Sequence, residues 1–372
     1  MTERVKRIVH VSESELDPCT GMGRVTTHWK QAFERRNVEF VHFGPERVGP
    51  GLHKALWHRA AVKAVRRANL CPDLVLAHEP ASYAFVEHGF RTFVFSHMPE
   101  RRVAEAVSGV IPRPPTVAAW MRRRAMDSLL WSWRQRQCDM GLRHAVMVLV
   151  SNRSDATYVR SFYGRRDRDV VVFRNGVTPV FDAPPVRPAA RSILFYASWV
   201  PRKGIATLVD AIAQLRGEGV PLEVIVCTGL GIQENLASWP PTLRDVVTVV
   251  PGIEQSEEAR LFEQAPIFVL PSFAEGQPLA LLQAMAFGRC CVVSDISGHV
   301  DLIQNGKTGF LFPPGDAASL ARSLRTCLES PDVCERLGMA AAESVRDRSW
   351  AEVSDEVVNW ILSRAGSTFH RH

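Results

Sequence analysis

Residues 271–288 read PSFAEGQPLALLQAMAFG, and they come directly after the apolar run Ile267–Leu270. The apolar run predicts a buried strand, the Glu275-Gly276 pair falls in the loop that follows it, and a helix is expected over Pro278–Phe287. Another apolar run, Cys290–Ser294, comes next. A strand, a helix and a second strand in this order predict a βαβ unit with parallel strands.

The same alternation runs through the rest of the chain. In the first half we expect helices at Met22–Arg36 and His53–Asn69 and strands at Arg7–Val11, Val38–Phe43, Asp73–Ala77, Thr92–Ser96, Ala145–Val150 and Val170–Phe173. In the second half we expect further strands at Ile193–Ala197, Leu222–Cys227 and Val246–Val250, and helices at Ile205–Arg216, Glu257–Gln264, Ala317–Glu329, Val333–Asp347 and Ala351–Ser363. The pattern predicts an α/β fold built on doubly wound, Rossmann-like parallel sheets.

The alternation is interrupted once, by DAPPVRPAAR at 182–191, whose three prolines favour an interdomain linker. A length of 372 residues also predicts two domains. We therefore expect an N-terminal α/β domain over 1–185 and a C-terminal α/β domain over 186–348. A C-terminal helix in 349–372 is expected to pack back toward the N-terminal domain.

The two halves differ in charge. Residues 1–190 hold 30 Lys/Arg and 18 Asp/Glu, a net of +12, whereas residues 191–372 hold 15 and 21, a net of −6. A basic half favours an anionic partner, such as a phosphorylated acceptor or a phospholipid surface. No nucleic-acid-binding motif accompanies the charge, so nucleic acid is not expected as a partner.

Cysteine usage and the lack of a long apolar run indicate the compartment. The eight cysteines include no C-x-x-C pair, which predicts reduced thiols rather than a disulfide framework or a zinc site. Neither a signal peptide nor a membrane-spanning run is visible. These features predict a cytoplasmic protein.

The segment 101–143 is basic, with nine Arg against three Asp/Glu, and it contains an Arg- and Trp-rich helix over 118–137. Trp120 and Trp131 fall outside the apolar stripe that is expected to face the core, which comprises Val117, Met121, Met126, Leu129, Leu130 and Trp133. Such a helix can dock on an anionic membrane surface, which would make the protein peripheral at the inner face of the membrane. The alternative is that the tryptophans pack inside the domain.

Ligands of open α/β sheets bind beyond the carboxyl ends of the strands, so polar residues that follow strands are the candidate site. Arg202 and Lys203 follow a strand and are suited to neutralise a diphosphate. A helix that starts near Pro278 offers free N–H groups to a phosphate, and Gly276 lets the backbone approach a ligand closely.

These segments resemble the group 1, or family 4, retaining glycosyltransferases of the GT-B fold. The strongest resemblance is to the block "PS-x-x-E-G-x-x-x-x-x-x-E-A-M-A-x-G", matched over 271–288, and to "V-P-x-K-G", matched over 200–204. Residues 292–303 resemble "V-V-x-S-x-x-G-G-x-x-E-x-I", and residues 306–316 match "G-x-T-G-x-L-x-x-P-G-D". The first half of the chain resembles the family less closely, at Thr20–Arg24, Phe95–His97, Ser151 and Asn175–Val177. The resemblance implies two α/β domains that face each other across a cleft.

The resemblance also implies roles for individual residues. Lys203, with Arg202 as a helper, would bind the donor diphosphate, and Glu275 would contact the hydroxyls of the donor sugar. The backbone of Gly276, Gln277, Pro278 and Leu279 would hold the sugar and the phosphate. His97 would lie near the donor sugar and stabilise the transition state. Gly21 and Gly23 would let the first glycine-rich loop pack against donor and acceptor, and neither a metal nor a cofactor is implied.

The chain departs from the family pattern at two donor-site positions. Gln283 stands where the family has a second glutamate that accepts hydrogen bonds from the ribose, and Ser198 stands where an arginine commonly touches the diphosphate. Replacing a charged hydrogen bond by a neutral one would weaken donor binding about tenfold.

The expected function is therefore that of a retaining hexosyltransferase in polysaccharide or glycolipid synthesis. It would move a sugar from a nucleoside-diphosphate sugar to the hydroxyl of a glycan or of a lipid-linked or phosphorylated acceptor. Two alternatives stay open at this point: a sugar-nucleotide 2-epimerase-like isomerase, and a catalytically weak or inactive nucleotide-sugar-binding relative.

Overall fold

The computed structural model describes residues 5–49, 54–108, 117–178, 191–229, 232–253 and 257–366. The chain forms two compact units, and each contains one six-stranded parallel sheet. Unit 1 comprises Met1–Glu105, Pro112–Asn175 and Trp350–His372, and unit 2 comprises Ala106–Ile111 and Gly176–Ser349. The expected linker at 182–191 lies outside the described residues except for Arg191.

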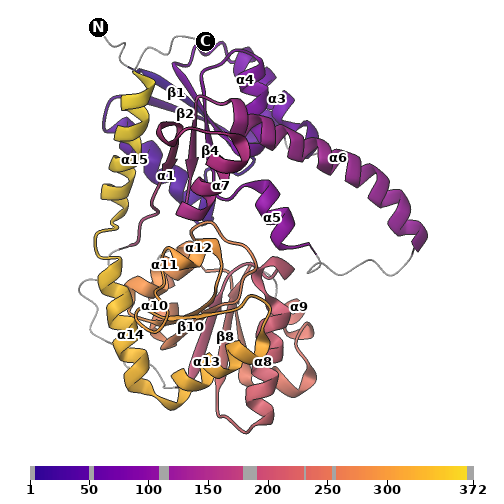
Figure 1. The fold of residues 1–372 in the computed structure, drawn as a ribbon, viewed down its shortest axis with the longest axis vertical. Helices are drawn as coiled ribbons and strands as arrows, with labels where there is room; N and C mark the ends of the chain where they lie inside the picture. Colours follow the sequence, from indigo (N-terminus) through magenta and orange to yellow (C-terminus); the bar gives the residue numbers. More distant parts are fainter. Residues whose placement is uncertain are drawn as a thin grey trace. The chain divides into compact units, whose positions relative to one another are not determined.

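Unit 1, drawn mainly in indigo to magenta in Figure 1, has the strand order β2-β1-β3-β4-β5-β6. Its strands are β1 (Arg7–Val11), β2 (Glu39–Phe43), β3 (Leu74–His78), β4 (Thr92–Ser96), β5 (Met147–Val150) and β6 (Val170–Val172). Its helices are α1 (Gly21–Glu34), α2 (Pro45–Val48), α3 (Lys54–Arg67), α4 (Glu79–Glu87), α5 (Glu100–Ala106), α6 (Val117–His144), α7 (Arg153–Tyr163), the 3-10 turn η1 (Asp167–Asp169) and α15 (Trp350–Ala365). The strands β4 and β5 are buried along their whole length, which explains why they read as continuous apolar runs.

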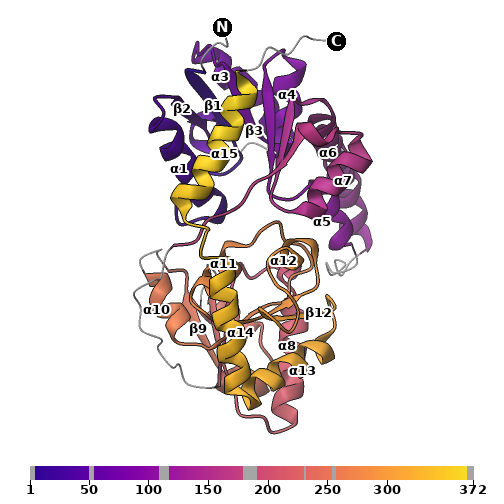
Figure 2. The same ribbon diagram turned by 60° about the vertical axis from the view of Figure 1, so that its left-hand side comes forward.

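The last helix, α15, belongs to unit 1, where it packs against α1 (Figure 2). Trp350 stacks on His28 of α1 with their rings 4.4 Å apart. Val353 and Ile361 are fully buried, so the helix contributes to the core of this unit. Asp355, at the rim, pairs with Arg36 at 2.8 Å.

The basic helix α6 packs against α3, α4 and α7 (Figure 1). The side chains of 117–128 lie outside the described residues, and with them Trp120 and the first half of the expected apolar stripe. Trp133 packs beside His58 of α3, with ring centroids 4.7 Å apart. The prediction that Leu129 faces the core is wrong, because this side chain is 72% exposed, and Trp131 is 49% exposed.

Unit 2 has the strand order β12-β11-β10-β7-β8-β9. Its strands are β7 (Ser192–Tyr196), β8 (Glu223–Thr228), β9 (Val247–Pro251), β10 (Ile267–Leu270), β11 (Cys290–Ser294) and β12 (Phe310–Phe312). Its helices are α8 (Ile205–Gly217), α9 (Ile232–Ala237), α10 (Glu258–Glu263), α11 (Leu279–Ala286), α12 (Ser297–Val300), α13 (Ala317–Glu329) and α14 (Pro331–Ser344), with 3-10 turns η2 (Pro201–Lys203) and η3 (Pro241–Val246).

The order of unit 2 has a switch point between β7 and β10. From β7 the chain adds β8 and β9 on one side, and it then returns to add β10, β11 and β12 on the other side. The loops that follow β7 and β10 therefore both start at the switch point, at the carboxyl edge of the sheet. Open α/β sheets bind their ligands at this position.

Candidate functional site

The loops after β7 and β10 are held together at the switch point. The backbone N–H of Phe273 donates to the carbonyl of Arg202 at 2.9 Å. Gly204 has φ 72°, and a Cβ at this position would lie 1.8 Å from the carbonyl oxygen of Pro271. Only glycine therefore fits between the 3-10 turn that carries Lys203 and the start of the loop that carries Glu275.

Glu275 is a buried carboxylate that two cations face. Lys203 Nζ donates to its Oε1 at 2.5 Å, and Arg202 Nη1 lies 3.5 Å from its Oε2. The Ser272 hydroxyl also donates to Oε1, at 2.7 Å. Burial alone would raise the pKa of Glu275, but the charges of Lys203 and Arg202 outweigh burial and lower that pKa to about 2. The carboxylate is therefore ionised at neutral pH.

His299, from α12, completes this group from the next strand along the sheet. Its Nδ1 donates to the carbonyl of Ser294 at 2.8 Å, and its Nε2 has no hydrogen-bond partner among the described residues. Burial lowers the pKa of His299 to about 4, against the opposing effect of Glu275, so the ring is neutral and Nε2 carries a lone pair. Gly298 allows α12 to approach, since a Cβ there would lie 2.3 Å from the Glu275 carbonyl oxygen.

The start of α11 lies directly after Glu275. The helix begins at Leu279, one residue later than expected, and Pro278 is its N-cap residue, with no side-chain cap on the first turn. Gly276 and Pro278 are buried, while Gln277 and Leu279 are half-buried. The first-turn N–H groups and the positive end of the helix dipole are suited to an anion, and they lie at the same edge as Lys203.

Two predicted donor-site residues stand apart from this group. Ser198 is exposed in the loop after β7. Gln283 is buried in α11, where its Oε1 accepts from the Thr178 N–H at 3.2 Å and its Nε2 donates to the Thr178 carbonyl at 3.3 Å. Both ends of the Gln283 amide are thus hydrogen bonded to the backbone within unit 2.

The remaining predicted residues lie in unit 1. His97 follows β4, and its ring packs edge-on against Phe95 with centroids 4.4 Å apart. Burial and the neighbouring His78 lower the pKa of His97 to about 3, so this ring is also neutral at pH 7. Any role for His97 in a reaction is therefore that of a neutral hydrogen-bonding group and not of a cation.

Gly21 and Gly23 were expected in a glycine-rich loop, but the structure places both in the first turn of α1. The Thr20 hydroxyl caps this turn by accepting from the Gly23 N–H at 3.1 Å. A Cβ on Gly23 would lie 2.0 Å from the carbonyl oxygen of Asp17. Gly23 is therefore required for the packing of the preceding loop on α1.

Glu79, at the carboxyl end of β3, is a second buried carboxyl group. Ser96 Oγ donates to its Oε2 at 2.5 Å, and the Glu100 N–H donates to its Oε1 at 3.0 Å. Burial, assisted by the charge of Glu100, raises the pKa of Glu79 to about 8. Glu79 thus accepts hydrogen bonds from Ser96 and Glu100, at the two ends of the segment that carries His97.

Sequence reasoning placed Lys203, Arg202 and Glu275 at one edge, and the structure brings these three together. It missed Ser272 and His299, which supply a hydroxyl and an unpaired ring nitrogen to the same edge. The rule that polar residues after parallel strands face the ligand could have found His299, five residues beyond Ser294 of β11.

Part of the chain is similar in sequence to known glycosyltransferases. The sequence pattern described as "Glycosyl transferases group 1" matches residues 190–330, which include the whole Lys203–Glu275–His299 group. A phosphatidyl-myo-inositol mannosyltransferase of Mycobacterium leprae is 28% identical over 197 residues, which are 51% of this chain and 52% of that protein. A D-inositol 3-phosphate glycosyltransferase of Streptomyces scabiei is 31% identical over 152 residues, or 40% of this chain. The matched region spans only 34% of that second relative.

Solved structures match over nearly the whole chain. Sucrose-phosphate synthase from Thermosynechococcus elongatus has a TM-score of 0.76 at 19% identity, covering 96% of this chain and 98% of that one. HepE of Anabaena, solved with UDP and glucose, has a TM-score of 0.66 at 16% identity, covering 96% and 100%. At these identities the likeness shows the fold alone. Residues 190–330 thus match the group 1 glycosyl transferases, and each unit has the doubly wound parallel sheet of the GT-B fold.

Proposed function

We propose that this chain transfers a sugar from a nucleoside-diphosphate sugar to an acceptor hydroxyl, with retention of configuration at the anomeric carbon. One observation carries the proposal: a buried carboxylate is kept ionised by Lys203 and Arg202 at the switch point of unit 2. Buried groups whose pKa is strongly shifted by neighbouring charges are typical of ligand sites, and this one lies beside the start of α11.

The diphosphate would be held by the two cations and by α11. The Lys203 ammonium has three donors, of which one is used by Glu275. The Arg202 guanidinium has five, of which one goes to the Ala274 carbonyl at 2.5 Å. The remaining donors can turn to phosphate oxygens without giving up Glu275. Charge-assisted bonds of this kind contribute about 1.5–3 kcal/mol each.

The sugar would be oriented by Glu275 and its neighbours. Oε1 already accepts from Lys203 and Ser272, whereas the nearest cation to Oε2 is Arg202 at 3.5 Å. Oε2 therefore has room to accept from a sugar hydroxyl. The lone pair on His299 Nε2 supplies a second acceptor near the same carboxylate.

In the reaction the bond between the anomeric carbon and the diphosphate oxygen breaks, and a bond to the acceptor oxygen forms. The departing diphosphate oxygen takes up the electron pair of the broken bond, and with it negative charge, and it accepts the proton that the acceptor hydroxyl loses. Lys203, Arg202 and the helix dipole stabilise that charge as it develops, which is the main electrostatic contribution expected of such a site.

The donor nucleotide and the acceptor are inferred from charge and relatives. HepE of Anabaena was solved with UDP, which supports a uridine nucleotide. The relatives named above act on a phosphatidyl-inositol and on an inositol 3-phosphate, as their names state, which supports a phosphate-bearing acceptor. The net charge of +12 over residues 1–190 is suited to such an acceptor.

The location is inferred from the thiols. All eight cysteines are free, which supports a reducing compartment such as the cytoplasm, with the basic segment 101–143 at the membrane's inner face if the acceptor is lipid-linked. No described helix has the length and apolar character needed to cross a bilayer.

The donor site is tested by thermal unfolding with UDP. At 100 times its Kd, UDP is expected to stabilise the protein by about 2.7 kcal/mol. Lys203→Ala should abolish this shift, because the diphosphate loses its main cation. Lys307→Ala, on an exposed lysine of the same unit, is the matched control and should keep it. Equal shifts in both variants would place the donor elsewhere.

A second candidate, a nucleotide-sugar-binding relative without turnover, is favoured by Gln283. The family's second glutamate is absent, and the amide in its place bonds the Thr178 backbone. Release of free UDP from UDP-sugars, measured with inositol phosphate and phosphatidyl-inositol acceptors, separates the two candidates. UDP binding without acceptor-dependent release would favour the non-catalytic one.

A further inference from the structure

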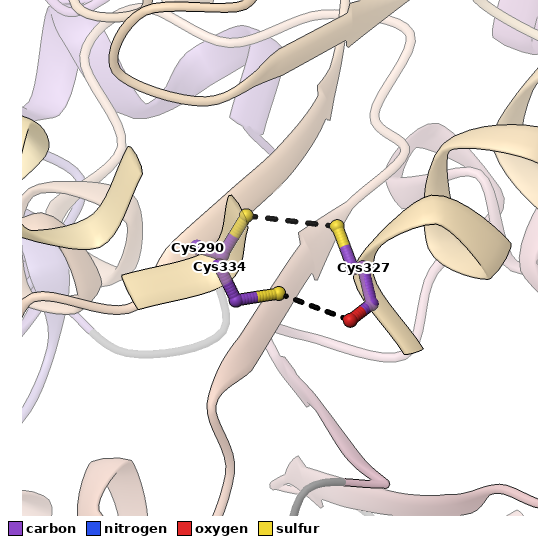
Figure 3. A group of neighbouring side chains, drawn as sticks. All are labelled: Cys290, Cys327 and Cys334. Atoms are coloured by element: carbon purple, nitrogen blue, oxygen red, sulfur yellow. Dashed lines mark hydrogen bonds between the residues drawn. The ribbon is translucent and has the colours of Figure 1, made fainter. Parts of the chain in front are cut away.

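Three cysteines of unit 2 meet in its core, although they are far apart in the sequence. Cys290 opens β11, Cys327 lies in the last turn of α13, and Cys334 lies in the first turn of α14. All three are buried, and their sulfur atoms lie within 4.8 Å of one another. Figure 3 shows the three side chains turned toward a common point. The sequence predicts scattered thiols, because no spacing between these residues suggests a cluster.

The geometry fits a metal ion with sulfur ligands. Cys290 Sγ and Cys327 Sγ are 3.6 Å apart (Figure 3). In a tetrahedral zinc site with Zn–S bonds of about 2.3 Å, two sulfurs lie about 3.8 Å apart. The observed separations thus bracket the required one, and small side-chain rotations would suffice to bring in Cys334.

A fourth ligand is supplied by the end of α13. The carbonyl of Cys327 would normally accept from the N–H four residues on, but that residue is Pro331, which has no N–H. The Cys334 thiol donates to this carbonyl instead, at 3.2 Å (Figure 3). When a metal binds the Cys334 sulfur and its proton passes to solvent, the Cys327 carbonyl oxygen loses its donor and becomes available as a fourth ligand.

The surrounding backbone brings the three sulfurs together and favours their negative charge. A Cβ on Gly338 of α14 would lie 2.0 Å from the Gly288 carbonyl oxygen, so glycine is required for α14 to approach the turn before Cys290. Gly338 is one helical turn beyond Cys334 and lies on the same face. Cys334 itself lies near the positive end of the α14 dipole, which stabilises thiolate.

We propose that Cys290, Cys327 and Cys334 form a binding site for one thiophilic divalent cation, Zn²⁺ or its analogue Cd²⁺, with the Cys327 carbonyl as fourth ligand. Binding releases the three thiol protons and leaves a net charge of −1. A monovalent soft cation would leave −2 in the same apolar core, so the divalent ion is favoured. The ion would join β11, α13 and α14, on a side of unit 2 whose residues are separate in sequence from the donor-site loops.

The test is titration of the metal-free, reduced full chain with Cd²⁺ alone. The exposed thiols Cys19 and Cys71 are first changed to alanine, so that only buried cysteines remain. One equivalent of Cd²⁺ is expected to saturate an ultraviolet thiolate-to-cadmium charge-transfer band. In this background Cys334→Ala should weaken binding at least tenfold. No band at stoichiometric Cd²⁺ in the folded background protein would overturn the proposal.

Cys291→Ala is the matched control. Cys291 is the next residue of β11, is equally buried and points to the other face of the strand, so its loss should leave the band unchanged. If Cys334→Ala fails to fold, X-ray absorption of the background protein loaded with one equivalent of Zn²⁺ decides. Three sulfur neighbours at about 2.3 Å are expected, and a shell of nitrogen and oxygen alone would contradict the site.

Discussion

Glu275 shows how one residue combines stability and function. Its carboxylate is 6% exposed, and it keeps its charge because Lys203 and Arg202 lie on either side of it. The folded chain therefore holds Glu275 ionised at a pH where the unfolded chain would protonate it. The pH dependence of stability reports directly on this ion pair.

The first prediction concerns Glu275→Gln in acid. The folded-state pKa of about 2 lies below the ordinary value of 4.5, so the carboxylate stabilises the fold above pH 4.5 and loses this contribution as the pH falls to 2. A difference of this size corresponds to about 3 kcal/mol. Between pH 5 and 2 the unfolding free energy of the wild type should therefore fall by about 3 kcal/mol more than that of Glu275→Gln.

Denaturant unfolding at a series of pH values measures this difference. Glu343→Gln is the control, because Glu343 pairs with Arg346 on the surface with 64% of its side chain exposed. Its pH profile should follow that of the wild type. Parallel profiles for Glu275→Gln and the wild type would show that the ion pair does not hold the charge of Glu275.

The second prediction concerns Gln283→Glu, which restores the family's second glutamate. A carboxylate can still accept from the Thr178 N–H, but it cannot donate to the Thr178 carbonyl and would repel it. We expect a loss of about 1–3 kcal/mol in unfolding free energy. The exposed Gln264→Glu should change it by less than about 0.5 kcal/mol. Equal effects of the two substitutions would contradict the hydrogen-bonding role of Gln283.

Among single residues, those whose role follows from their position after a parallel strand could be predicted from the sequence. Lys203 and Glu275 follow strands that are neighbours in a parallel sheet, and their approach could be predicted from that rule. The hydrogen bonds between Gln283 and Thr178 could not be predicted, because they join two residues 105 positions apart and depend on how the chain enters unit 2. Packing details of this kind carry no local sequence pattern.

At the scale of elements, buried strands were the most predictable. Thr92–Ser96, Ile267–Leu270 and Cys290–Ser294 have the expected bounds, because strands covered on both faces must be continuously apolar. The helices α4 and α7 and the three-residue strand β12 were not predicted. In α7 the buried residues Ala156, Val159 and Tyr163 recur at helical spacing, and Asn152 and Gly164 cap the helix, so the sequence carried a signal that the prediction missed.

The third prediction concerns the junction of η2 and α8. Gly204→Ala adds a Cβ where the Pro271 carbonyl oxygen would be 1.8 Å away, and it also forces alanine to φ 72°. The left-handed backbone alone costs about 1–2 kcal/mol. The clash must add to this cost and displace Lys203 from Glu275. We expect a loss of stability well above 2 kcal/mol together with loss of the UDP-induced thermal shift.

Gly219→Ala separates the two causes. Gly219 has φ 77°, but a Cβ there meets nothing within 4 Å. This control should show the backbone cost alone and should retain UDP binding. If Gly204→Ala is no worse than Gly219→Ala, the two donor-site loops do not depend on their close contact.

At the scale of the whole molecule, each unit has a core of its own. The unit 2 core is continuous from β7 to α14, while unit 1 closes its core with a helix from the far end of the sequence. Two such cores predict two unfolding transitions in calorimetry. UDP should raise the midpoint temperature of the transition that belongs to unit 2. The contribution of α15 can then be assigned to one transition.

The last prediction is that removal of residues 350–372 destabilises unit 1 selectively. The buried apolar side chains of α15 include Trp350, Val353, Val358 and Ile361. Each contributes about 1.5–3 kcal/mol, so the loss of all four is comparable to the whole unfolding free energy of a domain, about 5–15 kcal/mol. The transition of unit 1 should disappear, or its midpoint temperature should fall steeply. The transition of unit 2 should keep its midpoint temperature and its shift with UDP. Asp355→Ala, which removes the rim ion pairs with Arg35 and Arg36, should cost no more than about 2 kcal/mol, or about 1 kcal/mol for each pair. A joint fall of both transitions on truncation would mean that α15 stabilises both units, because a helix confined to unit 1 cannot change the unfolding of unit 2.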